Sequence, residues 1–154
     1  MNQGNNAPDI PPCEIFIDKE GRWFHKGAEI LRKDLIQLFY AHMDLDGDGR
    51  YRLLWQGKHC FLEVEDTAFV VKSIGGQEGS FALRLSDDST ERLMPETLSV
   101  GRDNVPYCLV KGGRFPARFT RAAYYQLAQH IEAGEDGRFF LRRGDKSYPI
   151  LFTR

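Results

Sequence analysis

Apolar residues recur at steps of three and four between positions 30 and 43, the spacing of one helical face. These residues are Leu31, Leu35, Leu38, Phe39 and Met43. Around this helix the apolar and polar residues alternate instead, which is typical of strands. The alternation predicts strands at 13–17, 22–25, 51–55, 60–64, 69–74 and 81–85. The first part of the chain is therefore expected to combine one amphipathic helix with hairpins and an antiparallel meander.

The C-terminal part repeats this order in a shorter form. The elements predicted there are a strand at 107–110, a turn at Gly112-Gly113, a returning strand at 114–119, a helix capped by Thr120 and running to about residue 133, and a closing hairpin of 139–142 and 148–152. The segment 91–104 has the weakest pattern and is expected to connect the two parts.

Short sequence matches accompany the repeated order of elements. Gly21-Arg22-Trp23 corresponds to Gly113-Arg114-Phe115, and Asp48-Gly49-Arg50-Tyr51 corresponds to Asp136-Gly137-Arg138-Phe139. We interpret the chain as an internal duplication, with two unrelated hairpin-helix units as the alternative. The predicted fold class is α+β, with two strand-rich repeats that each place one helix on an antiparallel sheet. The expected divisions are a flexible leader at 1–12, an N-terminal repeat with an extra meander at 13–90, and a shorter C-terminal repeat at 91–154.

Composition limits the environment and the partners. The 154 residues contain 21 Lys and Arg against 22 Asp and Glu, so net charge gives no reason to expect nucleic acid or an anionic membrane as a partner. No signal peptide or long apolar span is recognised. Cys13, Cys60 and Cys108 cannot all pair in one chain, and each is expected to be a reduced, packed thiol. We therefore expect a soluble, cytoplasmic protein.

The run Asp44-Leu45-Asp46-Gly47-Asp48-Gly49 matches the first half of a calcium loop, which needs oxygen ligands at positions one, three and five and Gly at six. Trp55 stands at the twelfth position, where a bidentate glutamate completes such a site. We interpret the run as a helix-to-strand turn, with calcium binding as a minor alternative. The histidines have no metal spacing and no nucleophile-base pattern is visible. The sequence predicts no metal site, no cofactor and no catalytic residue.

Two arginines stand at equivalent positions near the starts of the two predicted helices. Arg32 and Arg121 would converge if the repeats pack about a pseudo-twofold axis, and guanidinium groups bind carboxylates or phosphates through two parallel hydrogen bonds. Trp23, Tyr107 and Tyr124 can either pack in the core or stack on a planar ligand. The expected ligand-binding set is Trp23, Arg32, Asp66, Tyr107, Arg121 and Tyr124. An ion pair between each arginine and a local acid such as Asp66 or Glu29 is the alternative.

The run from Trp23 to Arg32, followed by Leu38-Phe39 and the turn at 48–51, carries a family likeness. Further segments at 64–71, 105–110 and 122–127 extend it over most of 15–152. In these segments the chain resembles the bacterial family catalogued as domain of unknown function 1285. The resemblance implies a duplicated core, a C-terminal half with some similarity to pleckstrin-homology-like folds, and a groove between the halves for a nucleotide-like ligand in signalling.

The expected function is a non-enzymatic binding or sensory module that takes a small, anionic, nucleotide-like molecule between the repeats. The alternative is a protein-interaction adaptor that uses an exposed sheet edge or aromatic patch and binds no small ligand. Catalysis by Asp66, His25 or His59 is a third hypothesis. Neither a nucleic-acid nor a membrane partner is expected, and the sequence leaves the oligomeric state open.

Overall fold

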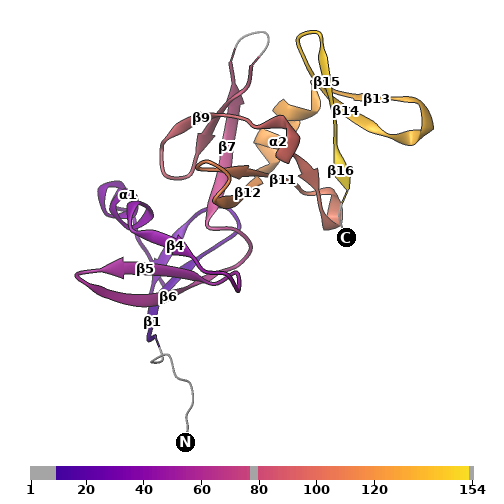
Figure 1. Cartoon of the computed structure of the whole chain (residues 1–154). Helices are drawn as coiled ribbons and strands as arrows, with labels where there is room; N and C mark the ends of the chain where they lie inside the picture. Colours follow the sequence, from indigo (N-terminus) through magenta and orange to yellow (C-terminus); the bar gives the residue numbers. More distant parts are fainter. Residues whose placement is uncertain (1–9, 77–79, 153–154) are drawn as a thin grey trace, which may run out of the picture.

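The structure is a computed structural model that describes residues 10–76 and 80–152, so the expected leader at 1–12 lies almost entirely outside the described residues. The fold is α+β, as predicted. Its first sheet runs in the order β3-β2-β1-β6-β5-β4, of which β1, β6, β5 and β4 are labelled in Figure 1. The elements of this N-terminal half are β1 (Pro12–Ile17), β2 (Trp23–His25), β3 (Ala28–Glu29), α1 (Lys33–Ala41), β4 (Met43–Leu45), β5 (Tyr51–Trp55) and β6 (Lys58–Val64).

A second sheet, in the order β16-β10-β11-β12-β7-β8-β9, and a small third sheet, β13-β14-β15, make up the C-terminal half. The elements of the second sheet are β7 (Phe69–Gly75), β8 (Ala82–Leu85), β9 (Thr90–Arg92), β10 (Ser99–Val100), β11 (Pro106–Val110), β12 (Phe115–Phe119) and β16 (Leu151–Phe152). The remaining elements are α2 (Arg121–Ala128), β13 (Ile131–Ala133), β14 (Phe139–Arg143), β15 (Lys146–Pro149) and the short 3-10 helices η1 (Pro95–Thr97), η2 (Arg102–Asn104) and η3 (Glu135–Gly137).

The order of elements supports the predicted duplication. A hairpin, a helix and three further strands occur twice, as β1, β2, α1, β4, β5, β6 and as β11, β12, α2, β13, β14, β15. The two copies are assembled differently. In the first copy β1 pairs in parallel with β6, which merges hairpin and meander into one mixed sheet. In the second copy the hairpin pairs in parallel with β7 and the last three strands form their own sheet.

The pairing of β7 also moves the division between the halves. The sequence places the meander of β7, β8 and β9 with the N-terminal repeat and divides the chain at residue 90. In the structure these three strands belong to the second sheet, because β7 pairs in parallel with β12 through Val70 and Arg118. The two sheets therefore divide the chain at residues 65–68.

Both helices end earlier than predicted because the chain continues as a strand soon after each of them, and α1 also begins later. Arg32 has extended backbone angles, so α1 begins at Lys33, and Leu31 is 78% exposed instead of lying on the buried face. Met43 is buried, but it belongs to β4, which pairs with β5. Residues 131–133 likewise pair with β14 as β13 and do not extend α2. Tertiary pairing thus overrides the local helical spacing.

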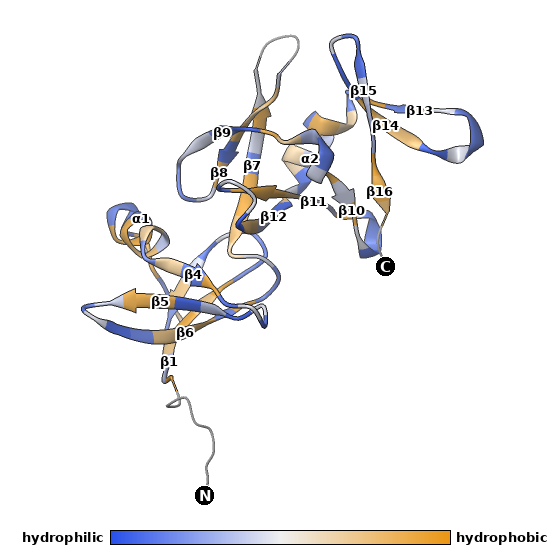
Figure 2. Cartoon of the chain, in the orientation of Figure 1, coloured by the Kyte–Doolittle hydropathy of each residue, from blue (hydrophilic) through white to orange (hydrophobic). Residues whose placement is uncertain are grey.

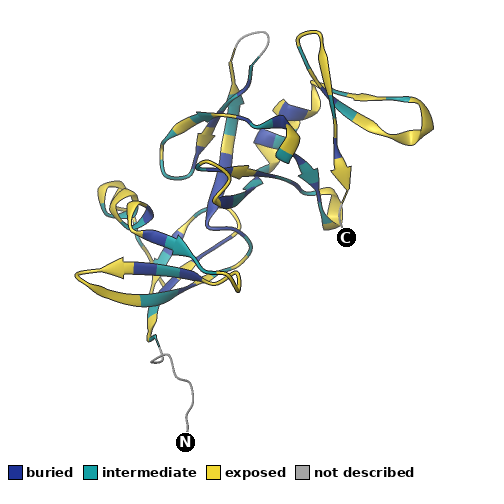
Figure 3. Cartoon of the chain, viewed as in Figure 1, coloured by how far each residue is buried: buried dark blue, intermediate teal, exposed yellow. Residues whose placement is uncertain are grey.

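One hydrophobic core extends through both halves, and the buried segments converge on the start of β7 (Figure 3). Tyr40 of α1 packs on Phe69, with ring centroids 4.8 Å apart, and Phe69 packs at the same distance on Phe115. The buried hydroxyl of Tyr40 donates a hydrogen bond to the carbonyl oxygen of Ala68 (2.7 Å). Figure 2 shows the apolar segments of β1 and β7 on either side of this junction. The halves are therefore packed against each other and not merely tethered.

Aspartates hold two tight turns of the N-terminal sheet. The Asp18 carboxylate accepts hydrogen bonds from the backbone amides of Glu20 and Arg22 and from Arg22 Nε (2.7 Å). Asp46 makes the same three kinds of contact with Asp48 and Arg50. The calcium-like run thus contains a tight turn before β5, but Asp44 and Leu45 belong to β4, so the turn joins two strands and not a helix to a strand. Within the described residues, no group of three or more His, Cys, Asp or Glu side chains is arranged to hold a metal.

We expect Asp18→Asn to lower the free energy of unfolding at pH 7 by about 1.5 to 3 kcal/mol, the contribution of hydrogen bonds to a charged group. Burial alone would raise the pKa of Asp18, but the hydrogen bonds from Arg22 and Glu20 outweigh it and lower the pKa. A lowered pKa contributes stability above about pH 4, and this contribution is lost as the pH falls through the folded-state value. Urea unfolding should therefore show a smaller difference from the wild type at pH 3 than at pH 7. Asp145→Asn, at an exposed position, is the control, and an equal difference at both pH values would contradict the prediction.

A disulfide joins Cys13 of β1 to Cys60 of β6, with the two Cα atoms 5.0 Å apart. The expectation that both residues are reduced thiols is therefore wrong. The parallel pairing of β1 with β6 brings together two cysteines that are 47 positions apart. Cys108 is buried as a free thiol, as predicted, and burial raises its pKa to about 12. With one bond formed, the cysteine pattern no longer indicates a reducing compartment.

Among the described residues, no helix is long and apolar enough to cross a membrane.

Candidate functional site

A cleft of about 450 Å³ lies between the two halves of the molecule. The N-terminal half contributes Lys19 and Glu20, from the turn between β1 and β2 that Asp18 holds. The C-terminal half contributes η2, the beginning of β11, the end of β12 and the first turn of α2. The cleft is therefore formed only when both halves are packed together.

Arg121 and Lys19 provide positive charge from the two sides of this cleft. Arg121 is the first residue of α2, and it is placed there because the Thr120 side chain caps the helix by accepting a hydrogen bond from the Ala123 amide (3.2 Å). Within residues 10–76 and 80–152, neither Arg121 nor Lys19 has a carboxylate within ion-pair distance. Glu20 and Asp103 also line the cleft, so its charge is mixed. The two basic side chains nevertheless remain available to an anion.

Aromatic side chains cover the part of the cleft that adjoins α2. Tyr124 is half-buried and Tyr125 is exposed, and their ring centroids lie 6.1 Å apart. A tyrosine offers a flat apolar surface for a planar ring together with a polar hydroxyl at its tip. Guanidinium, ammonium and phenol groups thus line one cavity.

A hydrogen-bonded network of Asp66, Tyr107 and Arg118 adjoins the cleft. Asp66 Oδ2 accepts hydrogen bonds from Tyr107 Oη (2.6 Å) and from Arg118 Nη1 (2.8 Å). Burial and the neighbouring carboxylate together raise the pKa of Tyr107 to about 12. Burial alone would lower the pKa of Arg118, but its hydrogen bond to Asp66 raises it. The network holds Arg118 charged where it lines the cleft, while Asp66 and Tyr107 face a neighbouring depression.

A smaller cavity of about 290 Å³ lies elsewhere between the halves, lined by residues of α1 and of the turn between β11 and β12. Lys111 Nζ forms an ion pair there with Asp87 Oδ2 (2.7 Å), and it lies 5.5 Å from the centre of the Phe69 ring. Although burial opposes it, the hydrogen bond from Lys111 helps to lower the pKa of Asp87. These two charges neutralise each other, which leaves Arg114 as the other basic side chain of this cavity.

The six residues predicted for a ligand site do not all come together. Arg121 and Tyr124 line the cleft, and Asp66 and Tyr107 lie beside it through Arg118. Trp23 is completely buried and packs on Phe39 and Tyr40. Arg32 is exposed and forms an ion pair with Asp34 (2.7 Å). The structure therefore does not bring Arg32 and Arg121 to one cavity, and it places Trp23 in the core.

Sequence reasoning missed Lys19, Arg118 and Tyr125. Lys19 follows Asp18 in the segment Asp18-Lys19-Glu20-Gly21, between the strands predicted at 13–17 and 22–25. Arg118 alternates with the buried residues Ala117 and Phe119 on β12, and this alternation places its side chain outside the core. That signal was present in the sequence, whereas the approach of Lys19 depends on how the halves pack.

Comparison with known proteins gives matches of two kinds. Residues 6–67 match the family model described as domain of unknown function (DUF1285), N-terminal domain, and the match ends where the first sheet gives way to the second. The fold is similar to the crystal structure of a DUF1285 family protein from Silicibacter pomeroyi DSS-3, with a TM-score of 0.73 and 21% identity over 97% of this chain and 90% of that chain. It is also similar to a DUF1285 family protein from Shewanella baltica OS155, with a TM-score of 0.65 and 18% identity over 77% of this chain and 91% of that chain. At sequence identities of 21% and 18%, the structural similarity shows a shared fold alone. A search of curated proteins gives no match.

Proposed function

We propose that this chain, whose residues 6–67 match the model of the DUF1285 N-terminal domain, is a small-molecule-binding module of a signalling system. The proposed ligand is anionic and nucleotide-like, and it occupies the cleft between the two halves. The observation that carries this proposal is that Lys19 and Arg121, from opposite halves, line one cavity without ion-pair partners in the described residues.

The chemistry of the lining suggests how such a ligand would be held. Arg121 can donate two parallel hydrogen bonds to a phosphate or carboxylate, and Lys19 adds a point charge from the other half. Tyr124 and Tyr125 offer aromatic surface to a planar base. A volume of about 450 Å³ lies in the ordinary range for small-molecule sites. Since both halves contribute, a bound anion would stabilise their packing, which is a physical basis for sensing.

A catalytic role has weaker support in this cleft. Tyr107 holds its proton tightly, and Asp66 is already engaged by Tyr107 and Arg118. His25 and His59 line none of the cavities described above. We therefore propose binding without catalysis, with Asp66 and Tyr107 as residues that position Arg118.

We expect thermal-shift screening of nucleotides and other phosphorylated metabolites to identify a ligand that raises the melting temperature of the wild-type protein. A ligand at 100 times its Kd adds about 2.7 kcal/mol to the stability of the folded state. Arg121→Ala should weaken binding by about tenfold or more, because hydrogen bonds to charged groups contribute about 1.5 to 3 kcal/mol.

Arg32→Ala is the matched control, since it removes the same charge from the start of the other helix, outside the cleft. Titration calorimetry with each variant separates an effect at the cleft from a general effect of charge. Equal loss of affinity in both variants, or no shift with any phosphorylated compound, would contradict the proposal.

A further inference from the structure

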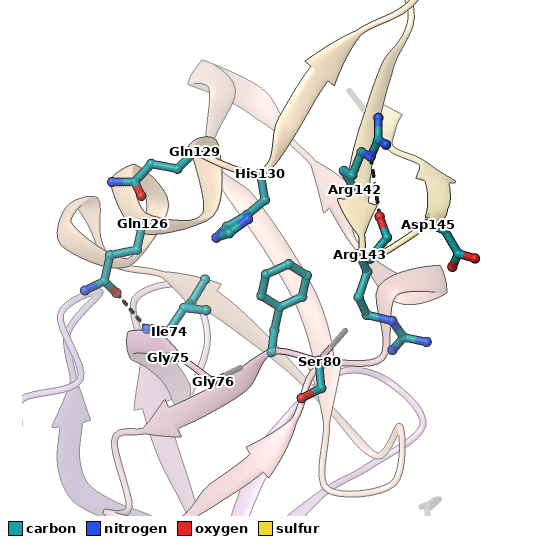
Figure 4. Close-up of a pocket in the computed structure, with 12 residues that line it drawn as sticks. Ile74, Gly75, Gly76, Ser80, Gln126, Gln129, His130, Arg142, Arg143 and Asp145 are labelled. Carbon is teal, nitrogen blue, oxygen red and sulfur yellow. Dashed lines mark hydrogen bonds between the residues drawn. The ribbon is translucent and has the colours of Figure 1, made fainter. Parts of the chain in front are cut away.

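A hollow of about 1110 Å³, larger than the cleft, lies within the C-terminal half (Figure 4). Its walls are the end of β7, the C-terminal turn of α2 and the turn between β14 and β15. We call it the β7 groove. Its volume exceeds the roughly 300 to 1,000 Å³ of ordinary small-molecule sites. The size favours a longer occupant, such as a stretch of polypeptide.

The groove runs along a strand edge that lacks a neighbour. β12 pairs only with Phe69, Val70 and Val71 of β7, because the chain leaves the sheet at Thr120 to form α2. One side of the remaining part of β7 pairs with β8, through Ser73, Ile74 and Gly75. On its other side no strand pairs with these residues in the described part of the chain. An unpaired strand edge presents backbone donors and acceptors to another chain.

A side chain occupies the place of the missing strand. Gln126 Oε1 of α2 accepts the hydrogen bond of the Ile74 amide at 2.7 Å, as Figure 4 shows. A carbonyl oxygen of an added strand would accept the same hydrogen bond. A Cβ atom at Gly75 would meet nothing within 4 Å, so another backbone can approach closely there. At Ile74 the amide is therefore satisfied by a side chain of α2, whose hydrogen bond an added strand can replace.

The other wall of the groove is basic. Arg142, Arg143 and His130 line it, against the single acid Asp145. Arg143 donates a hydrogen bond to Tyr148 Oη (2.8 Å), and no carboxylate in the described part of the chain lies within ion-pair distance of it. Arg142 pairs with Glu132 at 3.3 Å, where both side chains are more than half exposed. These charges complement an acidic segment.

We infer that the β7 groove binds an extended acidic peptide of a partner protein. The peptide adds a strand to the free edge of β7 at Ile74, where its main-chain carbonyl replaces Gln126, and its carboxylates contact Arg143 and Arg142. Main-chain pairing supplies affinity and the arginines supply specificity. This site is independent of the ligand proposed for the cleft between the halves.

The test uses the full chain and fluorescein-labelled peptides of eight residues in fluorescence anisotropy. A peptide that alternates glutamate and threonine should bind, and one that alternates lysine and threonine should not. The glutamate peptide with N-methyl groups on alternate amides should bind at least tenfold more weakly, because strand pairing needs these amides. Equal binding of the two charge types, or no loss on N-methylation, would overturn the inference.

Variants separate the groove from general electrostatics. Arg143→Glu should weaken binding of the glutamate peptide at least tenfold. Arg138→Glu makes the same charge change outside the groove and should change the affinity less than twofold. Gln126→Ala removes the competing acceptor and should leave the affinity equal or higher. A loss with Gln126→Ala, or equal effects of Arg143→Glu and Arg138→Glu, would rule out strand addition at this edge.

Discussion

Removal of the Cys13–Cys60 disulfide should lower the free energy of unfolding by about 4 kcal/mol. The bond closes a loop across 47 positions, and the loss of chain entropy in the unfolded state scales with the logarithm of that length. The loop contains nearly the whole first sheet. Loss of the disulfide should therefore destabilise the half that contributes Lys19 to the cleft. Urea unfolding of the wild type with and without dithiothreitol measures the effect.

Two variants make this measurement specific. Cys60→Ser should match the reduced wild type and should not respond to dithiothreitol. Cys108→Ala keeps the disulfide, so reduction should destabilise it as much as the wild type. If dithiothreitol leaves the unfolding midpoint of the wild type unchanged, the bond contributes nothing to stability and the prediction is wrong.

Local patterns were sufficient to predict the order of elements and its repetition. The alternation in 51–55 and 60–64 and the helical spacing in 33–41 depend on neighbouring residues, and the structure contains β5, β6 and α1 there. The partition of the chain into sheets depends on distant pairs instead. β7 could be recognised as a strand, but nothing in its own sequence shows that Val70 lies beside Arg118 and not beside the first sheet.

The difference between local patterns and distant pairs also explains why the disulfide was not predicted. Cys13 and Cys60 lie on strands that were each predicted from alternation. Their bond depends on the parallel pairing of β1 with β6, which brings Pro12 beside Phe61. Counting cysteines cannot reveal such a contact, because three residues permit a single bond as readily as none.

Only part of the candidate site was predicted, because some of its residues are close in sequence and others are not. Arg121 and Tyr124 belong to one helix face, and Arg118 precedes that helix by three positions, so local reasoning keeps them together. The pairing of Arg32 with Arg121 assumed that the two copies meet about a symmetry axis. The copies are assembled into different sheets, so equivalent sequence positions do not become equivalent positions in space.

Replacing Trp23 with alanine should destabilise the protein by about 3 to 5 kcal/mol, the range for removing a large aromatic side chain from a core. Trp23 is completely buried and packs edge-on against Tyr40, with ring centroids 4.9 Å apart. Tyr40 in turn donates its hydroxyl hydrogen bond to Ala68, at the junction of the two halves. The cavity would therefore loosen the packing that forms the cleft. Urea unfolding followed by far-ultraviolet circular dichroism measures the loss.

Trp23→Phe distinguishes a core residue from a ligand contact, because it retains an aromatic ring in the same place. Its stability should lie between those of the wild type and Trp23→Ala, and its affinity for any ligand of the cleft should equal that of the wild type. Arg121→Ala should show the opposite behaviour, with nearly unchanged stability and weaker binding, since its side chain is exposed. If Trp23→Phe has wild-type stability but binds the ligand tenfold more weakly, Trp23 contacts the ligand and the prediction that it acts through the core is wrong.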